Sequence, residues 1–215
     1  MNNLSNELQG VIAQMLKPLK GLSLEIVIEG LSGHKVIPFN KKDPKDQKVL
    51  ETLKTCAKNV KHYVNNEING IKRNRPNEVG NDIEPIVEKE LKNLGYQANK
   101  PTTNQGHKKA TGYPDLEFID EFNRLNYLEC KTFNIKNINT TQRSFYLSPS
   151  EDFKVTQDAH HFGISFEIYE ETLNVYKIRS WKILDLSKLK LNVKYEFNSD
   201  NKHLYSKELI LAEGN

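Results

Sequence analysis

Apolar residues recur with helical spacing in two parts of the first third of the chain. Between residues 5 and 19 they are separated by three or four positions, which predicts an amphipathic helix. The same spacing over residues 45–71 predicts a second, longer helix. The apolar run LSLEIVI at residues 22–28 favours a short strand, and residues 30–42 favour a loop. Residues 1–75 are therefore expected to form a largely helical N-terminal extension.

The middle of the chain changes from helical spacing to alternation. Residues 81–94 carry an apolar stripe with helical spacing, and Gly95 is a suitable residue to end such a helix. Residues 116–119 and 127–133 are apolar or alternating segments of strand length. The residues between them are polar, which predicts two strands joined by a turn.

Alternation continues in the C-terminal third of the chain. Residues 162–169 and 173–178 predict two further strands, and residues 181–191 predict turns with a short edge element. Residues 193–197 are expected to form a last strand. Because no internal repeat or low-complexity linker interrupts the pattern, the whole chain (1–215) is predicted to be a single α/β domain with its core in residues 76–215.

The composition is that of a folded protein outside the membrane. Hydrophobic residues make up 37% of the chain and charged residues 27%. No apolar run approaches the roughly 18 residues that span a bilayer, and the N-terminus has no secretory pattern. We therefore expect a cytoplasmic protein whose two cysteines, Cys56 and Cys130, stay reduced.

The basic residues are unevenly distributed, although the net charge is only +3. No acidic residue occurs between residues 95 and 114 or between residues 132 and 150. Both stretches contain lysines, so a polyanion would meet positive potential there. The pattern favours phosphate binding over two polar loops that lack acidic residues by chance.

The two strands of the predicted hairpin bring chemically active side chains together. A turn centred near Phe122 would place Asp115 directly across from Glu129. Because side chains alternate along a strand, Lys131 shares the face of Glu129. The two carboxylates would then be close enough to bind one divalent cation. Each residue taken singly is also compatible with an ordinary surface ion pair.

The Pro-Asp pair ending at Asp115, followed by Glu129-x-Lys131, resembles the Pro-Asp…Glu-x-Lys signature of a metal-dependent nuclease superfamily. That superfamily includes restriction endonucleases and recombination nucleases. The resemblance covers about residues 81–169. It implies a restriction-endonuclease-like core, with a mixed central sheet flanked by helices, and Mg²⁺-dependent hydrolysis of DNA. In this pattern Asp115, Glu129 and the carbonyl of Cys130 bind the metal, and Lys131 assists the attacking water and the phosphate.

The predicted helix over residues 81–94 is similar to the first helix of the same superfamily. There a glutamate near the helix start points at the metal site, and that position falls on Glu84 here. Glu78 and Glu88 are the alternatives. As an ordinary surface residue, Glu84 would gain only slightly from the helix dipole.

The segment that follows Lys131 resembles the corresponding segment of several type II restriction endonucleases, with an Arg/Ser/Phe/Tyr loop, a Ser-Pro-Ser turn, Lys-Val and Asp-Ala-x-His. The resemblance therefore implies a type II restriction endonuclease that cuts double-stranded DNA as a homodimer and is functionally paired with a cognate DNA methyltransferase. Three alternatives stay open: a Holliday-junction resolvase, a RecB-like repair nuclease, and a non-enzymatic DNA-binding domain on the same fold. Gln142 and Tyr146 give the looser match to the RecB-like enzymes.

Basic and amide side chains near the predicted site are the residue types that contact phosphates and base edges. The residues predicted to contact DNA are Lys108, Lys109, Asn139, Gln142, Arg143, Ser144 and Lys154. Composition alone is equally compatible with a plain polar loop. His160 and His161 are predicted to be helix-end or buried core histidines rather than general bases.

Overall fold

The computed structural model describes residues 2–15, 19–109, 112–141, 144–194, 199–204 and 206–212. The chain forms two compact units. The larger unit spans Ser23–Leu189, and the smaller one combines Met1–Leu22 with Lys190–Asn215. The predicted site residues all fall within the larger unit.

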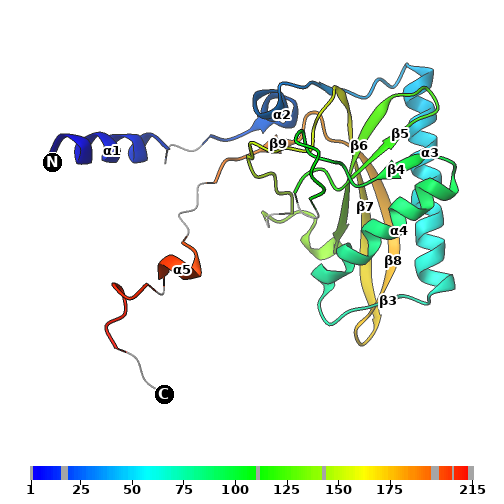
Figure 1. Cartoon of the computed structure of the whole chain (residues 1–215). Coiled ribbons are helices and arrows are strands. Elements are labelled where there is room, and N and C mark those ends of the chain that lie inside the picture. Colours follow the sequence, from blue (N-terminus) through cyan, green and yellow to red (C-terminus); the bar gives the residue numbers. More distant parts are fainter. Residues whose placement is uncertain are drawn as a thin grey trace. The chain divides into compact units, whose positions relative to one another are not determined.

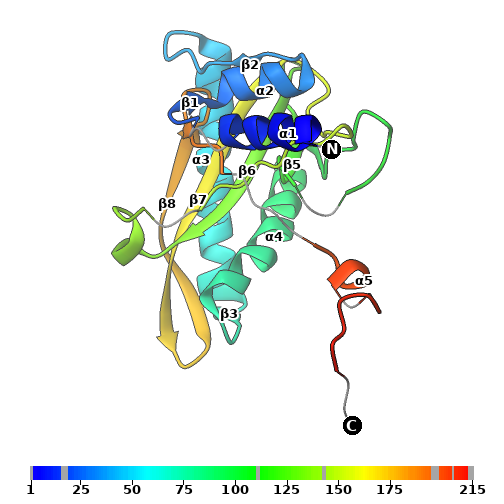
Figure 2. The same ribbon diagram turned by 90° about the vertical axis from the view of Figure 1, so that its left-hand side faces the viewer.

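A seven-stranded mixed sheet forms the centre of the larger unit (Figure 1). Its main path runs β3-β8-β7-β6-β5-β4, and β2 pairs with β7. The β6–β7 and β2–β7 pairs are parallel, and the other pairs are antiparallel. The strands are β2 (Val36–Ile37), β3 (Ile71–Lys72), β4 (Gln97–Asn99), β5 (Leu116–Ile119), β6 (Leu125–Phe133), β7 (Ala159–Thr172) and β8 (Val175–Asp185). The β7–β8 hairpin extends beyond the end of β6 (Figure 2).

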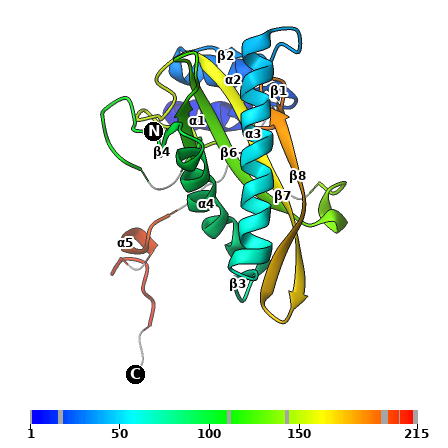
Figure 3. The same cartoon turned by 90° about the vertical axis from the view of Figure 1, so that its right-hand side faces the viewer.

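Two helices cover one face of this sheet (Figures 1 and 3). Helix α3, Pro44–His62, continues as a π-helical turn, Tyr63–Glu67, and α4, Val79–Asn93, follows a 3₁₀ turn, Pro76–Glu78. Their apolar stripes pack against alternate strand residues in one core, because side chains on a strand point to the two faces in turn. The predicted mixed sheet with flanking helices and a helical N-terminal region is confirmed.

The remaining elements are short. In the larger unit α2, Leu24–Ser32, buries Leu24 and Ile28. The smaller unit contains α1, Asn2–Met15, and α5, Asn201–Leu204. A two-residue strand β1, Leu22–Ser23, pairs with β9, Lys190–Leu191. Among the helices of the described ranges, none is long and apolar enough to cross a membrane.

The prediction of a strand at residues 22–28 is wrong. Only Leu22–Ser23 is extended, and the rest of the run begins α2. Leu24 and Ile28 lie one helical turn apart and are both buried, while Ile26 between them is 60% exposed. A run of apolar residues this short fits a strand or a helix equally well. Here the helix buries Leu24 and Ile28 together on one side.

Other predicted boundaries in the N-terminal third are also wrong. The loop predicted for residues 30–42 contains the end of α2 and the strand β2. The helix predicted for residues 45–71 ends before Ile71, which begins β3 and pairs with Tyr176 of β8.

The C-terminal prediction was wrong at the sheet edge. Residues 181–185 continue β8 rather than forming turns, and Asp185 pairs with Phe162 of β7. In the strand predicted for residues 193–197, the first two residues are not extended into a strand. The other three lie outside the described residues.

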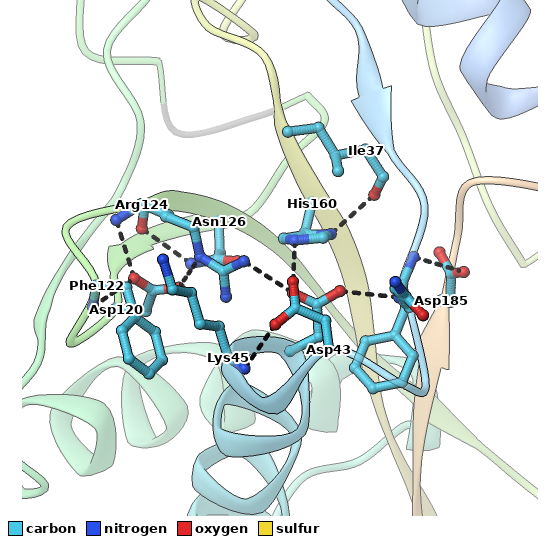
Figure 4. Close-up of polar contacts among 12 residues, drawn as sticks. Ile37, Asp43, Lys45, Asp120, Phe122, Arg124, Asn126, His160 and Asp185 are labelled. Carbon is cyan, nitrogen blue, oxygen red and sulfur yellow. Dashed lines mark hydrogen bonds and ion pairs between the residues drawn. The ribbon is translucent and has the colours of Figure 1, made fainter.

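A buried polar network ties the start of α3 to the sheet (Figure 4). Asp46 lies 2.8 Å from the Arg124 guanidinium and 3.3 Å from Nε2 of His160. Arg124 also pairs with Asp120 at 2.8 Å, and Nδ1 of His160 lies 2.9 Å from the Ile37 carbonyl. Burial alone would raise the pKa of Asp46, but hydrogen bonds from a backbone N–H and from Arg124 lower it. Asp46 is therefore held as a carboxylate in the interior.

Candidate active site

The β5–β6 hairpin has the register that the sequence predicted. Leu116 pairs with Leu128 and Ile119 pairs with Leu125, so the turn is centred on Phe122. Asp115 lies one residue before β5. Its carboxylate accepts a hydrogen bond of 2.8 Å from the backbone N–H of Cys130 in β6. The local hairpin therefore brings Asp115 beside the Glu-x-Lys segment.

Successive residues of β6 point to the two faces of the sheet. Leu128 and Cys130 enter the core beneath α3 and α4. Glu129 and Lys131 share the opposite face, where the Lys131 ammonium lies 2.5 Å from the Glu129 carboxylate. The Glu129 side chain is only 4% exposed, whereas that of Lys131 is 34% exposed. Thus a buried carboxylate is joined to an ammonium that solvent can reach.

The surroundings of Glu129 disfavour its ionised form. Burial and then the nearby charge of Asp115 raise its pKa to about 7, and Lys131 offsets only part of this rise. For Lys131 burial acts to lower the pKa, but the Glu129 charge, its hydrogen bond and the Asp115 charge raise it overall. Oε2 of Glu129 is buried and has no hydrogen-bond partner among the described residues. This oxygen is available to a cation.

The donor set at this position fits a hard divalent cation. Asp115 and Glu129 offer carboxylate oxygens, and Mg²⁺ in proteins is commonly held by one or two carboxylates and several waters. Within the described part of the chain, no three His, Cys, Asp or Glu side chains form a ready-made metal cluster. A pair of carboxylates suits a cation that keeps several of its waters.

Glu84 lies on α4 close to these carboxylates. Its charge acts on the Cys130 thiol together with those of Asp115 and Glu129. The Glu84 carboxylate pairs with the Lys100 ammonium at 2.7 Å. The alternative Glu88 pairs with Lys92 at 2.6 Å.

The third helix glutamate, Glu78, belongs to the 3₁₀ turn before α4. Its charge acts on Arg73 and Tyr176, at the other end of the helix-covered sheet. Among the three candidates, Glu84 is the one whose charge acts together with those of Asp115 and Glu129 on both Cys130 and Lys154.

The structure does not place the predicted DNA-contacting residues in one common environment. Lys108, Asn139 and Ser144 are exposed. The Lys109 ammonium is 2.9 Å from the Asp152 carboxylate, which also lies 3.1 Å from His107. Gln142 and Arg143 lie outside the described residues. The acid-free stretch before Asp115 is thus partly neutralised by an acid from a later segment.

Lys154 lies in the interior rather than on the surface where a DNA contact was predicted. It is 4% exposed, and its ammonium donates to the carbonyls of Gly112 and Pro114 at 2.8 and 3.2 Å. Sequence reasoning missed this contact. The two segments are about forty residues apart, and no local pattern indicates that they meet.

His160 and His161 are both buried at the start of β7, as core histidines rather than at a helix end. Nδ1 of His161 lies 2.6 Å from the Tyr113 hydroxyl, and the two rings are stacked. Burial lowers the pKa of His161 to about 3, so its ring is neutral. His160 belongs to the polar network around Asp46.

Comparison with known proteins gives consistent matches over nearly the whole chain. The family model described as the type II restriction enzyme MjaV family matches residues 18–208. The type II restriction enzyme MjaV of Methanocaldococcus jannaschii is 39% identical over 221 aligned positions, which cover 96% of this chain and 95% of that protein. No solved structure matches the chain.

Proposed function

The chain belongs to the MjaV family of type II restriction enzymes, and on this premise we propose that Asp115, Glu129 and Lys131 form the catalytic centre of a Mg²⁺-dependent, sequence-specific DNA endonuclease. The observation that carries the proposal is the buried Glu129 beside Asp115, with one carboxylate oxygen unpaired among the described residues. An ionised carboxylate pair in the interior is costly unless a cation compensates it.

Asp115 and Glu129 would hold the metal, with the Cys130 carbonyl as a third ligand. Bound there, Mg²⁺ would supply positive charge to the scissile phosphate and make water a stronger nucleophile at neutral pH. Asp115 is already oriented by the backbone N–H of Cys130. Glu84 would hold a water at the edge of the site or support a second ion. For this its carboxylate would have to separate from the Lys100 ammonium.

Lys131 would act on the phosphate and on the attacking water. Its ammonium is anchored to Glu129 and partly exposed, so it can reach a phosphate that approaches this face of the sheet. The raised pKa keeps it protonated, which suits stabilising the negative charge that develops on phosphorus better than accepting a proton.

The DNA would approach the face that carries Glu129 and Lys131. Exposed Lys108, Asn139 and Ser144 are proposed contacts, and Lys109 joins them if the phosphate competes with Asp152. Gln142 and Arg143 complete the proposed set. They lie in the sequence between Asn139 and Ser144, which are both exposed. We propose a homodimer, because two-fold proteins match palindromic sites. A cognate methyltransferase would protect host DNA, and the enzyme would act in the cytoplasm.

The test is cleavage of plasmid or phage DNA by purified protein in Mg²⁺ and in EDTA. We expect discrete fragments only with Mg²⁺, and no fragments from Asp115→Asn or Lys131→Met, both of which should stay folded. Exposed Glu151→Gln is the matched control and should cut normally. Cutting of branched DNA alone would favour a junction resolvase, and a smear would favour a repair nuclease. Wild-type cleavage by either site variant would contradict the assignment of the catalytic centre.

A further inference from the structure

The segment that delivers Asp115 to the site has little regular structure of its own. Residues 112–115 precede β5 and lie outside any helix or strand. A carboxylate on such a segment has to be fixed by contacts from elsewhere if it is to bind a metal with defined geometry. The contacts of Gly112, Tyr113 and Pro114 therefore bear directly on the position of Asp115.

Lys154 makes two of these contacts. Its ammonium donates to the carbonyl oxygen of Gly112 at 2.8 Å and to that of Pro114 at 3.2 Å. The two carbonyls bracket Tyr113, and the second belongs to the residue directly before Asp115. One buried side chain thus holds the backbone on both sides of Tyr113 by hydrogen bonds.

The burial of this lysine calls for an explanation. Lys154 is 4% exposed, and no carboxylate forms an ion pair with it among the described residues. A buried ammonium without a paired anion is costly. Burial lowers its pKa, and the charges of Asp115, Glu84 and Glu129 partly offset that effect. The ammonium therefore contacts backbone carbonyls, and the carboxylates of the candidate site stabilise its charge without touching it.

Tyr113 fixes the same segment from a second direction. Its hydroxyl lies 2.6 Å from Nδ1 of His161, its ring stacks on the His161 ring, and it meets Phe145 edge to face. Because His161 is part of β7, this contact ties the segment to the sheet. Lys154 and Tyr113 restrain the segment through independent groups.

We propose that Lys154 is a positioning residue, which holds the Gly112 and Pro114 carbonyls and so keeps Asp115 oriented toward Glu129, with Tyr113 as a second restraint. The inference rests on the proposed function of Asp115 and Glu129 as the metal-binding pair. It differs from a DNA contact, because the ammonium faces backbone carbonyls in the interior.

The test compares Lys154→Met with Lys58→Met, which changes an exposed lysine on α3 far along the chain from the site residues. Methionine replaces the aliphatic part of the side chain but has no ammonium to donate to the two carbonyls. At saturating DNA and Mg²⁺ we expect kcat to fall about 100-fold in Lys154→Met, the size expected for a misplaced catalytic group. DNA affinity in EDTA and its salt dependence should stay as in the wild type. Lys58→Met should change neither quantity.

A phosphate contact would give the opposite pattern. If Lys154 bound DNA, the variant would bind DNA more weakly, and the salt slope of log K would fall by about 0.9, with kcat unchanged. Either that pattern or a wild-type kcat and affinity would overturn the proposal.

A calorimetric titration of the DNA-free protein with Mn²⁺ separates this inference from the proposed function. We expect affinity for Mn²⁺ to fall about tenfold in Lys154→Met, because the Asp115 oxygen is no longer held in place. This readout does not need cleavage. A wild-type protein that binds Mn²⁺ but cuts no DNA would count against the proposed function alone, whereas unchanged Mn²⁺ binding in the variant would count against the role of Lys154.

Tyr113→Phe decides the matter if Lys154→Met does not fold. It removes only the hydroxyl that meets His161 and keeps the ring contacts. We expect a smaller loss of kcat, about tenfold, with unchanged DNA affinity. A wild-type kcat and wild-type Mn²⁺ affinity in this variant would show that the contacts of this segment do not position Asp115.

Discussion

Replacing Glu129 by glutamine is expected to stabilise the metal-free protein at alkaline pH while abolishing cleavage. The carboxylate is 4% exposed, stands beside Asp115 and has one oxygen without a partner among the described residues. Glutamine has nearly the same shape and can still accept a hydrogen bond from Lys131. It removes the charge that burial and Asp115 penalise.

The size of the effect follows from the pKa. A tenfold change in an equilibrium constant is about 1.4 kcal/mol, so raising the pKa of Glu129 from 4.5 to about 7 corresponds to about 3 kcal/mol. Because the pKa is higher in the folded chain, the stabilisation by the bound proton is complete below pH 4.5 and is lost as the pH rises through 7. The advantage of the glutamine variant should therefore be about 1 kcal/mol or less at pH 5 and about 3 kcal/mol at pH 8.

The assay is urea unfolding of both proteins in EDTA at several pH values between 5 and 8, with Glu151→Gln as the control. The exposed Glu151 should give no pH-dependent difference. Adding Mg²⁺ should stabilise the wild type and not Glu129→Gln, because a ligand stabilises only the state that binds it. A variant less stable than the wild type at pH 8, or a difference that does not grow with pH, would refute the electrostatic reasoning.

Three further predictions concern stability and can be checked by urea unfolding. Arg124→Met should cost about 3–5 kcal/mol, because it removes the guanidinium that pairs with the buried carboxylates of both Asp46 and Asp120, which then keep only His160 and backbone N–H donors among the described residues; a loss below 1 kcal/mol would contradict this. Leu128→Ala should cost about 2–5 kcal/mol, because Leu128 is fully buried beneath the helices, and a negligible loss would mean that the core has collapsed around the gap. His161, whose pKa falls from 6.5 to about 3 on folding, contributes stability that is present above pH 6.5 and lost as the pH falls toward 3. His161→Gln should therefore lose less stability than the wild type between pH 6.5 and pH 4, and equal losses would argue against a neutral buried ring.

The sequence determined the hairpin and its chemistry. Glu129 and Lys131 fall on one strand face by alternation alone, and the polar turn centred on Phe122 sets Asp115 opposite them. These residues lie within seventeen positions of each other, so local rules of pleating and turn formation suffice. The helix that carries Glu84 could also be predicted from the sequence, because its apolar stripe is long and regular.

Only the tertiary structure decided the elements whose partners are distant in sequence. Residues 24–28 form a helix rather than a strand because Leu24 and Ile28 are buried on the same side of it. Lys154 looked like a surface lysine, yet its ammonium is enclosed against two carbonyls near Asp115. Burial and long-range hydrogen bonds are properties of the packed chain, and a local sequence pattern does not determine them. The catalytic residue types and their spacing could therefore be predicted from a short stretch of sequence. The contacts of Lys154 that hold Asp115 in position depend on how distant segments pack.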